Sequence, residues 1–254
     1  MEGLDFAGRT ALVTGAASGI GKAVAGWLDR HGIAEVVAVD IDEAGLDALD
    51  LTCQLRRIAG DVADPCLWER VEGELDRLDH AHINAGVANG GALADLDFAE
   101  WRRIMAINLD GAFLGLRTAL RVMKRQGSGR SIVLTSSIVG VKPTAMTGAY
   151  GASKAAVAHL ARIAAAEHFK DGIRINAVAP GRVDTPIWTT TDQFKALEAR
   201  LGRDGALRAL GKQAGGDHAF ADADELAGQI GFLLSDAAAT ITGTVLVSDG
   251  GYSL

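Results

Sequence analysis

Short apolar runs alternate along the chain with longer segments whose apolar residues recur at helical spacing. Most of the residues in these runs are apolar, which is typical of parallel strands that are buried on both faces. They occupy residues 11–13, 36–39, 132–134, 173–178 and 244–247. The helical segments occupy residues 19–30, 65–75, 98–124, 150–169 and 223–234. This alternation predicts a doubly wound α/β fold, because parallel neighbours need crossover helices and these cover both faces of the sheet.

The alternation stops after Pro186, where polar residues precede a new run of helical spacing and then a glycine-containing stretch. The residues concerned are Thr189, Thr190, Thr191, Phe194, Leu197, Leu201, Leu207, Leu210, Ala214, Gly215 and Gly216. This pattern predicts a helical flap at about residues 186–220. No linker or internal repeat divides the sequence, so we expect residues 1–254 to form one domain that carries this flap.

The composition narrows the class of protein and its partners. The chain has 254 residues, of which 48% are hydrophobic, and its formal net charge is −7. It therefore lacks the basic surface that binds the phosphate backbone of nucleic acids. Its two cysteines, Cys53 and Cys66, are too few for a secreted disulfide framework, and no apolar run approaches the roughly 18 residues of a membrane span. We expect a cytoplasmic protein without a nucleic-acid or membrane partner.

A glycine-rich turn follows the first predicted strand and leads into a helix. Its sequence from residue 14 to residue 21 is TGAASGIG, which includes Gly15, Ser18, Gly19, Ile20 and Gly21. Glycines let the backbone turn sharply, and the free N–H groups of the helix that follows face an anion such as a pyrophosphate. The spacing is GxxxGxG and not the general GxGxxG, so a tight turn without a ligand is the competing interpretation.

An acidic residue ends the second predicted strand. Asp40 lies 19 residues after Gly21, close to the spacing of about 20 that is expected for a carboxylate on the adenosine ribose. Such a carboxylate accepts hydrogen bonds from the ribose hydroxyls and repels a 2′-phosphate, while Ser18 offers no cation to neutralise one. Asp40 and Ser18 together predict that the cofactor is NAD and not NADP. The competing interpretation of Asp40 is a solvated aspartate at the end of a strand.

Candidate chemistry is concentrated between residues 137 and 154. Tyr150 and Lys154 lie four positions apart in a strongly helical stretch, and therefore one turn apart on one face. A tyrosine that works near neutral pH needs its pKa of about 10 lowered by roughly 3 units, or about 4 kcal/mol. A cation about 4 Å away supplies about that much. Ser137 lies thirteen positions before Tyr150, at the end of a strand expected over residues 131–136, and no GxSxG motif surrounds it that would indicate a nucleophile.

The order of these motifs resembles the short-chain dehydrogenase/reductase family over essentially the whole chain. The residues that carry the resemblance are TGxxxGIG at 14–21, Asn84-Ala85-Gly86, Asn108, Ser137, YxxxK at 150–154 and Pro180-Gly181. The resemblance implies a Rossmann-type sheet of about seven parallel strands. It also implies that Tyr150 is the general acid/base, that Lys154 lowers its pKa and holds the nicotinamide ribose, that Ser137 orients the substrate and that Asn108 holds a water linking Lys154 to solvent.

The same resemblance assigns the remaining cofactor contacts. Asp61 and Val62 would contact the adenine, and Asn84, Ala85 and Gly86 the adenosine ribose side. Pro180, Gly181, Val183 and Thr185 would meet the nicotinamide carboxamide. The chain departs from the family's Asn-Asn-Ala-Gly at Ile83, which puts one hydrogen bond within the sheet in doubt. The predicted helices 98–124 and 150–169 are apolar around much of their circumference, so one face of each is available to contact a second subunit. The resemblance makes a homotetramer the first expectation, with a dimer as the alternative.

Other features carry less specific chemistry. His80 and His82 share one face of a strand, but no third metal ligand lies at readable spacing, so packed or hydrogen-bonded histidines are the better interpretation and no metal is expected. Further candidates for the wall of a substrate pocket are Trp188, Val139, Lys142, Met146 and residues 88–93.

These observations predict an oxidoreductase that transfers a hydride between NAD and a secondary alcohol or ketone. The alternatives are an NADP-dependent 3-ketoacyl-type reductase and a non-catalytic dinucleotide-binding protein. The complete set of Asn108, Ser137, Tyr150 and Lys154 argues against the latter, because a binding protein needs no proton relay.

Overall fold

Seven parallel strands form one sheet at the centre of the molecule. The computed structural model describes residues 4–88, 90–127, 130–190, 192–213 and 220–254. The strand order is β3-β2-β1-β4-β5-β6-β7, and every neighbouring pair is parallel. The strands are β1 (Thr10–Thr14), β2 (Glu35–Asp40), β3 (Gln54–Ala59), β4 (His80–Ile83), β5 (Arg130–Thr135), β6 (Ile173–Pro180) and β7 (Val245–Ser248). The predicted doubly wound, Rossmann-type fold is confirmed.

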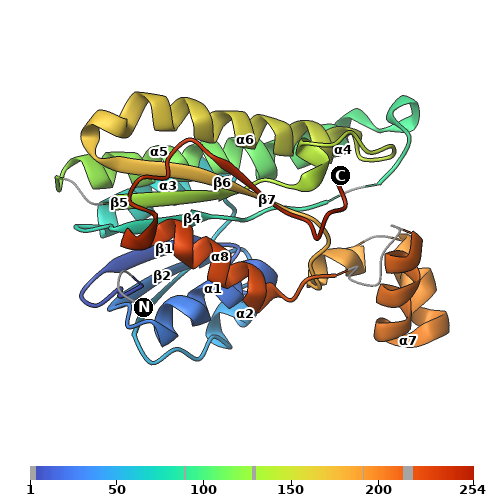
Figure 1. Cartoon of the computed structure of the whole chain (residues 1–254), viewed down its shortest axis with the longest axis horizontal. Coiled ribbons are helices and arrows are strands. Elements are labelled where there is room, and N and C mark those ends of the chain that lie inside the picture. The colour runs from blue at the N-terminus through green and yellow to red at the C-terminus, as the bar shows by residue number, and fades with distance from the viewer. Residues whose placement is uncertain (1–3, 89, 128–129, 191, 214–219) are drawn as a thin grey trace.

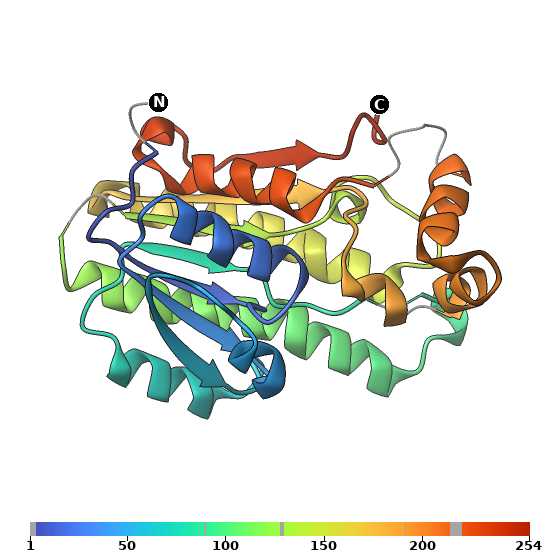
Figure 2. The ribbon, with the colours of Figure 1, turned by 90° about the horizontal axis from the view of Figure 1, so that it is seen from below.

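Helices cover both faces of the sheet (Figures 1 and 2). The helices are α1 (Gly19–Arg30), α2 (Glu43–Asp47), α3 (Pro65–Glu74), α4 (Phe98–Met105), α5 (Gly111–Lys124), α6 (Gly148–His168), α7 (Asp192–Gln213) and α8 (Ala223–Leu234). Of these, α7 lies apart from the sheet. Buried residues of α3, α5 and α6 share one core cluster, and those of α1, α2 and α8 share the other. The direction of winding reverses between β1 and β4, and a reversal of this kind opens a ligand crevice at the carboxyl ends of the strands.

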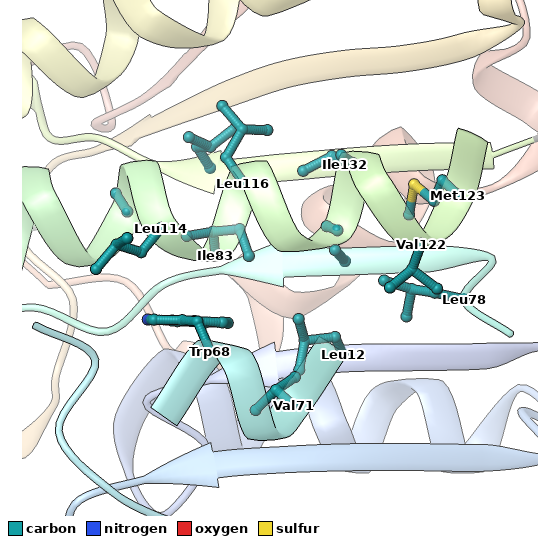
Figure 3. Close-up of a cluster of buried hydrophobic side chains, with 14 of the residues drawn as sticks. Leu12, Trp68, Val71, Leu78, Ile83, Leu114, Leu116, Val122, Met123 and Ile132 are labelled. Carbon is teal, nitrogen blue, oxygen red and sulfur yellow. The ribbon is translucent and has the colours of Figure 1, made fainter. Parts of the chain in front are cut away.

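The larger core cluster is anchored by Trp68 of α3 (Figure 3). Its ring is 1% exposed, and its indole N–H donates to the carbonyl of Val62 at 2.8 Å. A Cβ at Gly115 of α5 would lie 2.7 Å from the Trp68 ring, so the absence of a side chain lets the two helices approach. Ile83, which replaces the first asparagine of the family motif, is 4% exposed in this cluster and contributes apolar burial where a polar group was expected.

Three local features differ from the sequence pattern. Residues 98–124 form not one regular helix but α4 and α5, joined by a π-helical turn at Ala106–Asp110. Strand β3 lies at the edge of the sheet and carries Arg56 and Arg57, so it shows no apolar run. Helix α2 was not predicted because its five residues include a single buried side chain, that of Leu46.

The predicted flap is helical where the structure describes it. It comprises a 3₁₀ helix at Pro186–Thr190 and helix α7, which bends at Gly202, where φ is +69°. A small cluster of Phe194, Ala206 and Leu210 is its core, separate from the two large ones. The predicted Ala214-Gly215-Gly216 stretch lies outside the described residues, as do Thr191 and position 89 of the candidate wall 88–93. No described helix is long and apolar enough to cross a membrane.

Candidate active site

The glycine-rich turn between β1 and α1 forms a backbone cradle. Gly15 and Gly19 have φ of +65° and +52°, which L side chains rarely adopt. A Cβ at Gly21 would lie 2.0 Å from the carbonyl oxygen of Gly15, so only glycine fits there. The side chain of Ser18, the residue before α1, makes no capping hydrogen bond. The first N–H groups of α1, around Ile20, are therefore available to an anion, and the cradle fits a dinucleotide pyrophosphate.

The loop after β4 closes the floor of this crevice. The Thr14 hydroxyl accepts hydrogen bonds from the backbone N–H groups of Asn84 at 2.8 Å and Ala85 at 3.0 Å. The Asn84 amide donates to the Thr14 carbonyl at 3.1 Å, and a Cβ at Gly15 would lie 2.9 Å from that amide nitrogen. Strand β1, the glycine turn and the Asn84 segment are thereby fixed together at the point where the winding of the sheet reverses.

Asp40 ends β2 beside the glycine turn. Its carboxylate accepts hydrogen bonds from the backbone N–H groups of Ala17 at 2.9 Å and Asp42 at 3.0 Å, and the residue is half-buried. The carbonyl of Asp40 accepts from Gly60 at 2.9 Å, which places the neighbouring Asp61 at the same edge of the sheet. Val62 is buried against Gly111, where a Cβ would lie 2.8 Å from it. The residues expected at the adenosine end therefore share one edge of the crevice.

Tyr150, Lys154 and Ser137 meet where α6 passes the carboxyl end of β5. Ser137 precedes a short 3₁₀ helix at Ile138–Gly140, and a Cβ at Gly140 would lie 2.7 Å from the backbone of Lys154. This close approach seats the end of β5 on the first turns of α6. The Ser137 side chain neighbours that of Tyr150, and the Lys154 ammonium lies 5.9 Å from the centroid of the Tyr150 ring. The structure thus brings the three predicted residues together.

The electrostatics of this group differ from the sequence expectation. Burial raises the pKa of Tyr150 above its ordinary value, and the hydrogen bond with Ser137 opposes that rise. The ammonium of Lys154 is directed to the carbonyl of Thr135 at 2.9 Å, and burial lowers the pKa of Lys154 to about 8. The pKa of Tyr150 is therefore raised and not lowered as the sequence predicts. The reason is that burial disfavours the charged forms of both Tyr150 and Lys154.

Asn108 lies in the π-helical turn and is completely buried. Its amide donates to the Val87 carbonyl at 2.9 Å and to the Ser153 hydroxyl at 3.1 Å, and its oxygen accepts from the Val87 N–H at 2.8 Å. A Cβ at Gly86 would lie 3.1 Å both from that oxygen and from the Lys154 ammonium. Asn108, Gly86 and Lys154 therefore lie side by side.

The segment after β6 approaches the glycine turn from the other side. The Gly181 N–H donates to Ser248 at 2.8 Å as the chain leaves Pro180. Val183 and Thr185 are buried, and a Cβ at Gly19 would lie 3.2 Å from the side chain of Thr185. The residues expected at the nicotinamide end therefore adjoin those expected at the pyrophosphate.

The remaining candidates have structural partners. His80 and His82 are buried and hydrogen-bond Ser131 and Thr135, each at 2.8 Å, and burial lowers the pKa of both to about 3. Within the described parts of the chain, no group of three or more metal-ligating side chains occurs. The Trp188 indole donates to Val183 at 2.8 Å and packs edge-on against Phe220, so it helps to anchor the flap.

Sequence reasoning missed the supporting residues Thr14, Thr135 and Ser153. Each one orients a functional group, namely the Asn84 segment, the Lys154 ammonium or the Asn108 amide. Thr135 acts through its backbone carbonyl, which leaves no signal in the sequence. The only signal of Thr14 and Ser153 is a hydroxyl side chain within a buried strand or on the buried face of a helix. That signal does not reveal the partner.

Residues 15–253 match the family model described as enoyl-(acyl carrier protein) reductase. The chain belongs to the short-chain dehydrogenase/reductase family. It is 41% identical over 99% of both chains to a cis-4-hydroxycyclohexanecarboxylate dehydrogenase of Sinomonas cyclohexanicum. Among solved structures it is similar to levodione reductase, with a TM-score of 0.87 and 32% identity over 98% of both chains. Another is L-sorbose reductase of Gluconobacter frateurii, in complex with NADPH and L-sorbose, with a TM-score of 0.90 and 27% identity over 98% of both chains.

Membership of this family makes the chain an oxidoreductase that acts on secondary alcohols or ketones, with a nicotinamide dinucleotide as its cofactor. The crevice described above fits that cofactor on structural grounds. Its glycine cradle leaves no room for a Cβ at Gly21, and the free N–H groups of α1 face it.

Proposed function

We propose that this chain is an NAD-dependent dehydrogenase that interconverts a cyclic secondary alcohol and its ketone. The observation that carries the proposal is the meeting of Tyr150, Ser137 and Lys154 at the end of β5, with the Lys154 ammonium 5.9 Å from the centroid of the Tyr150 ring. Cyclic substrates are favoured because two of the similar proteins are named for a hydroxycyclohexanecarboxylate and for levodione.

In this proposal the chain's own residues handle the proton and the oxygen. The dinucleotide, when bound, supplies the carbon that accepts or returns the hydride. Tyr150 removes the hydroxyl proton of the alcohol, and Ser137 donates a hydrogen bond to the substrate oxygen as it becomes a carbonyl. The Lys154 ammonium favours the phenolate of Tyr150 and holds the cofactor ribose. Asn108 holds a water that carries the proton from Lys154 to solvent.

The other contacts to the cofactor follow the edges of the crevice. Gly15, Ser18, Gly19, Ile20 and Gly21 would surround the pyrophosphate. Asp61 and Val62 would contact the adenine, with Asn84, Ala85 and Gly86 on the adenosine ribose side. Pro180, Gly181, Val183 and Thr185 would hold the carboxamide. The close contacts of the glycine turn with Asn84 on one side and with Thr185 on the other support the assignment.

Asp40 supports the choice of NAD. Its carboxylate is held by two backbone N–H groups at the end of β2, so it is oriented before a ribose arrives. A 2′-phosphate there would meet this negative charge. Titration of the protein with NADH and with NADPH, followed by nicotinamide fluorescence, tests the choice. We expect NADH to bind at least about 10-fold more tightly, and tighter binding of NADPH would contradict it and favour a 3-ketoacyl-type reductase.

The substrate class is tested by an NAD-reduction screen over matched cyclic and acyclic secondary alcohols. We expect reduction with at least one cyclohexanol derivative and slower turnover of its open-chain counterpart. Turnover confined to acyclic alcohols would overturn the cyclic assignment. Binding of NADH without turnover of any alcohol or ketone would instead favour a non-catalytic dinucleotide-binding protein.

A homo-oligomer is also part of the proposal. Phe113 of α5 and Ile163 of α6 are 46% and 44% exposed, and these helices cover the same face of the sheet. Exposed apolar side chains on two long helices suit a self-complementary interface. Sedimentation equilibrium is expected to give a tetramer or a dimer, and a monomer at micromolar concentration would contradict the proposal.

A further inference from the structure

Three loops at the carboxyl ends of the strands place two cationic side chains against one aromatic ring. Lys142 follows β5, Arg182 follows β6 and Tyr252 follows β7, and these strands are neighbours in the sheet. The Lys142 ammonium lies 4.8 Å from the centroid of the Tyr252 ring, and the central guanidinium carbon of Arg182 lies 5.4 Å from it. All three residues are half-buried. Neither cation has a role in the catalytic scheme above.

The two cations have no anionic partner in the described part of the chain. Lys142 donates to the backbone carbonyl of Tyr252 at 2.9 Å, and no ion pair is formed by either Lys142 or Arg182 among the described residues. The nearby Asp249 uses its carboxylate to accept the N–H groups of Gly251 and Ser253, at 2.9 and 2.8 Å. Two like charges held against one ring, in a chain of net charge −7, form a site that an anion would neutralise.

The position of this pair relates it to the reacting groups. Lys142 lies five residues after Ser137, and its N–H donates to Ile138 at 2.8 Å, so the intervening turn is compact. That turn packs on α6 beside Tyr150, because a Cβ at Gly151 would lie 3.2 Å from the Val139 carbonyl. Arg182 directly follows Gly181. Figure 1 shows the C-terminal residues on the side of the sheet to which β6 and β7 point, the side on which α7 also lies.

We propose that Lys142 and Arg182 bind a carboxylate of the substrate, at the end remote from the hydroxyl group that is oxidised. A guanidinium is planar and matches the two oxygens of a carboxylate, while an ammonium adds a point charge from the other side. The Tyr252 ring contacts both cations, and its carbonyl accepts a hydrogen bond from Lys142. The substrate class is then a cyclic hydroxy acid or the corresponding keto acid. This inference rests on the proposed function, since it assumes that Tyr150 and Ser137 engage the hydroxyl.

The test uses one pair of probes that differ only in charge, cis-4-hydroxycyclohexanecarboxylate and its methyl ester. Steady-state NAD reduction is measured for the wild-type protein and for the variants Lys142→Met, Arg182→Met and Arg182→Lys. Lys170→Met is the matched control, because the Lys170 ammonium also lies over an aromatic ring, that of Phe169 at 5.7 Å, outside the proposed site. Thermal unfolding of each variant verifies that it is folded.

We expect the wild-type protein to use the carboxylate about 10-fold or more better than the ester in kcat/KM. Lys142→Met and Arg182→Met are each expected to lose about 10-fold or more with the carboxylate, mainly through KM, and to stay within about twofold with the ester. Arg182→Lys is expected to recover part of the loss, and Lys170→Met to change neither probe.

Each other outcome has a definite meaning. Equal use of carboxylate and ester by the wild-type protein, or an equal loss of both probes in folded variants, would overturn the carboxylate site while leaving the proposed function intact. Turnover of neither probe by a wild-type protein that oxidises another cyclohexanol would also overturn the carboxylate site alone. Turnover confined to acyclic alcohols would contradict the proposed function, and the inference would fall with it.

Discussion

Replacing Lys154 with methionine is expected to stabilise the protein while abolishing turnover. The ammonium is 4% exposed, and burial lowers its pKa from 10.5 to about 8. At about 1.4 kcal/mol per pH unit, this difference means that burying the charged form costs about 3 kcal/mol. Methionine removes that cost and fills a similar volume. It leaves the Thr135 carbonyl without its donor, which costs about 1–2 kcal/mol, so the net gain near pH 7 is about 1–2 kcal/mol.

The gain depends on pH with a definite sign. Between the folded pKa of about 8 and the unfolded value of 10.5, the unfolded chain binds more protons at Lys154 than the folded chain does. The wild-type protein therefore gains stability as the pH rises through this interval, and loses it as the pH falls towards 8. From about pH 7 to about pH 9.5 this amounts to about 2 kcal/mol. The methionine variant lacks the effect, so its advantage shrinks or reverses at high pH.

Urea unfolding of the wild-type protein and of Lys154→Met, at about pH 7 and about pH 9.5, measures how the difference in their free energies of unfolding changes with pH. Lys170→Met serves as the control, because Lys170 is exposed at the surface and its substitution is expected to leave the difference independent of pH. A methionine variant that is less stable than the wild type at both pH values, by the same amount, would refute the reasoning. It would show that the hydrogen bond to Thr135 outweighs the desolvation of the charge.

Three further predictions concern Gly21 of the cradle, the buried His82 and Asp40. Gly21→Ala is expected to abolish binding of NADH in a titration, because its Cβ would meet the Gly15 carbonyl at 2.0 Å, whereas Gly73→Ala, with nothing within 4 Å, is expected to bind normally. The wild-type protein loses stability as the pH falls from about 6.5 towards 3, because His82 is protonated in the unfolded chain but, with a pKa of about 3, not in the folded one. His82→Leu is expected to lessen this loss in urea unfolding, and an unchanged dependence of stability on pH would contradict the prediction. Asp40→Ala is expected to weaken NADH binding and to narrow the preference over NADPH about 10-fold or more; an unchanged ratio would show that Asp40 does not contact the ribose.

Much of the fold follows from the sequence because the central strands are buried on both faces. Such strands carry mostly apolar residues, and the apolar runs within β1, β2, β5 and β6 are recognised on this basis. Strand β3 escapes because it lies at the edge of the sheet, where Arg56 pairs with Glu35 and Arg57 donates to the Leu46 carbonyl. The polar side chains of β3 bind groups that lie next to them only in the folded chain.

The candidate site shows the same division. The spacing of Tyr150 and Lys154 is local, so helix geometry alone predicts that they share a face, and the structure places them together. Asn108 reaches Gly86 and Lys154 from a π-helical turn, which no regular spacing of 3.6 residues indicates. The pKa of Tyr150 depends mainly on burial by segments that are distant in the sequence. Its distance from Lys154 along the helix therefore predicts a lowered pKa, where burial gives a raised one.

The central claim is that the Tyr150 hydroxyl transfers the proton while the rest of the site holds the cofactor and the substrate. Tyr150→Phe tests it most directly, with NADH binding and alcohol turnover measured on the same preparation. The account predicts that NADH binds with nearly wild-type affinity and that turnover falls by at least about 100-fold. Turnover within about tenfold of the wild type, with NADH bound, would show that another group carries the proton and would contradict the account.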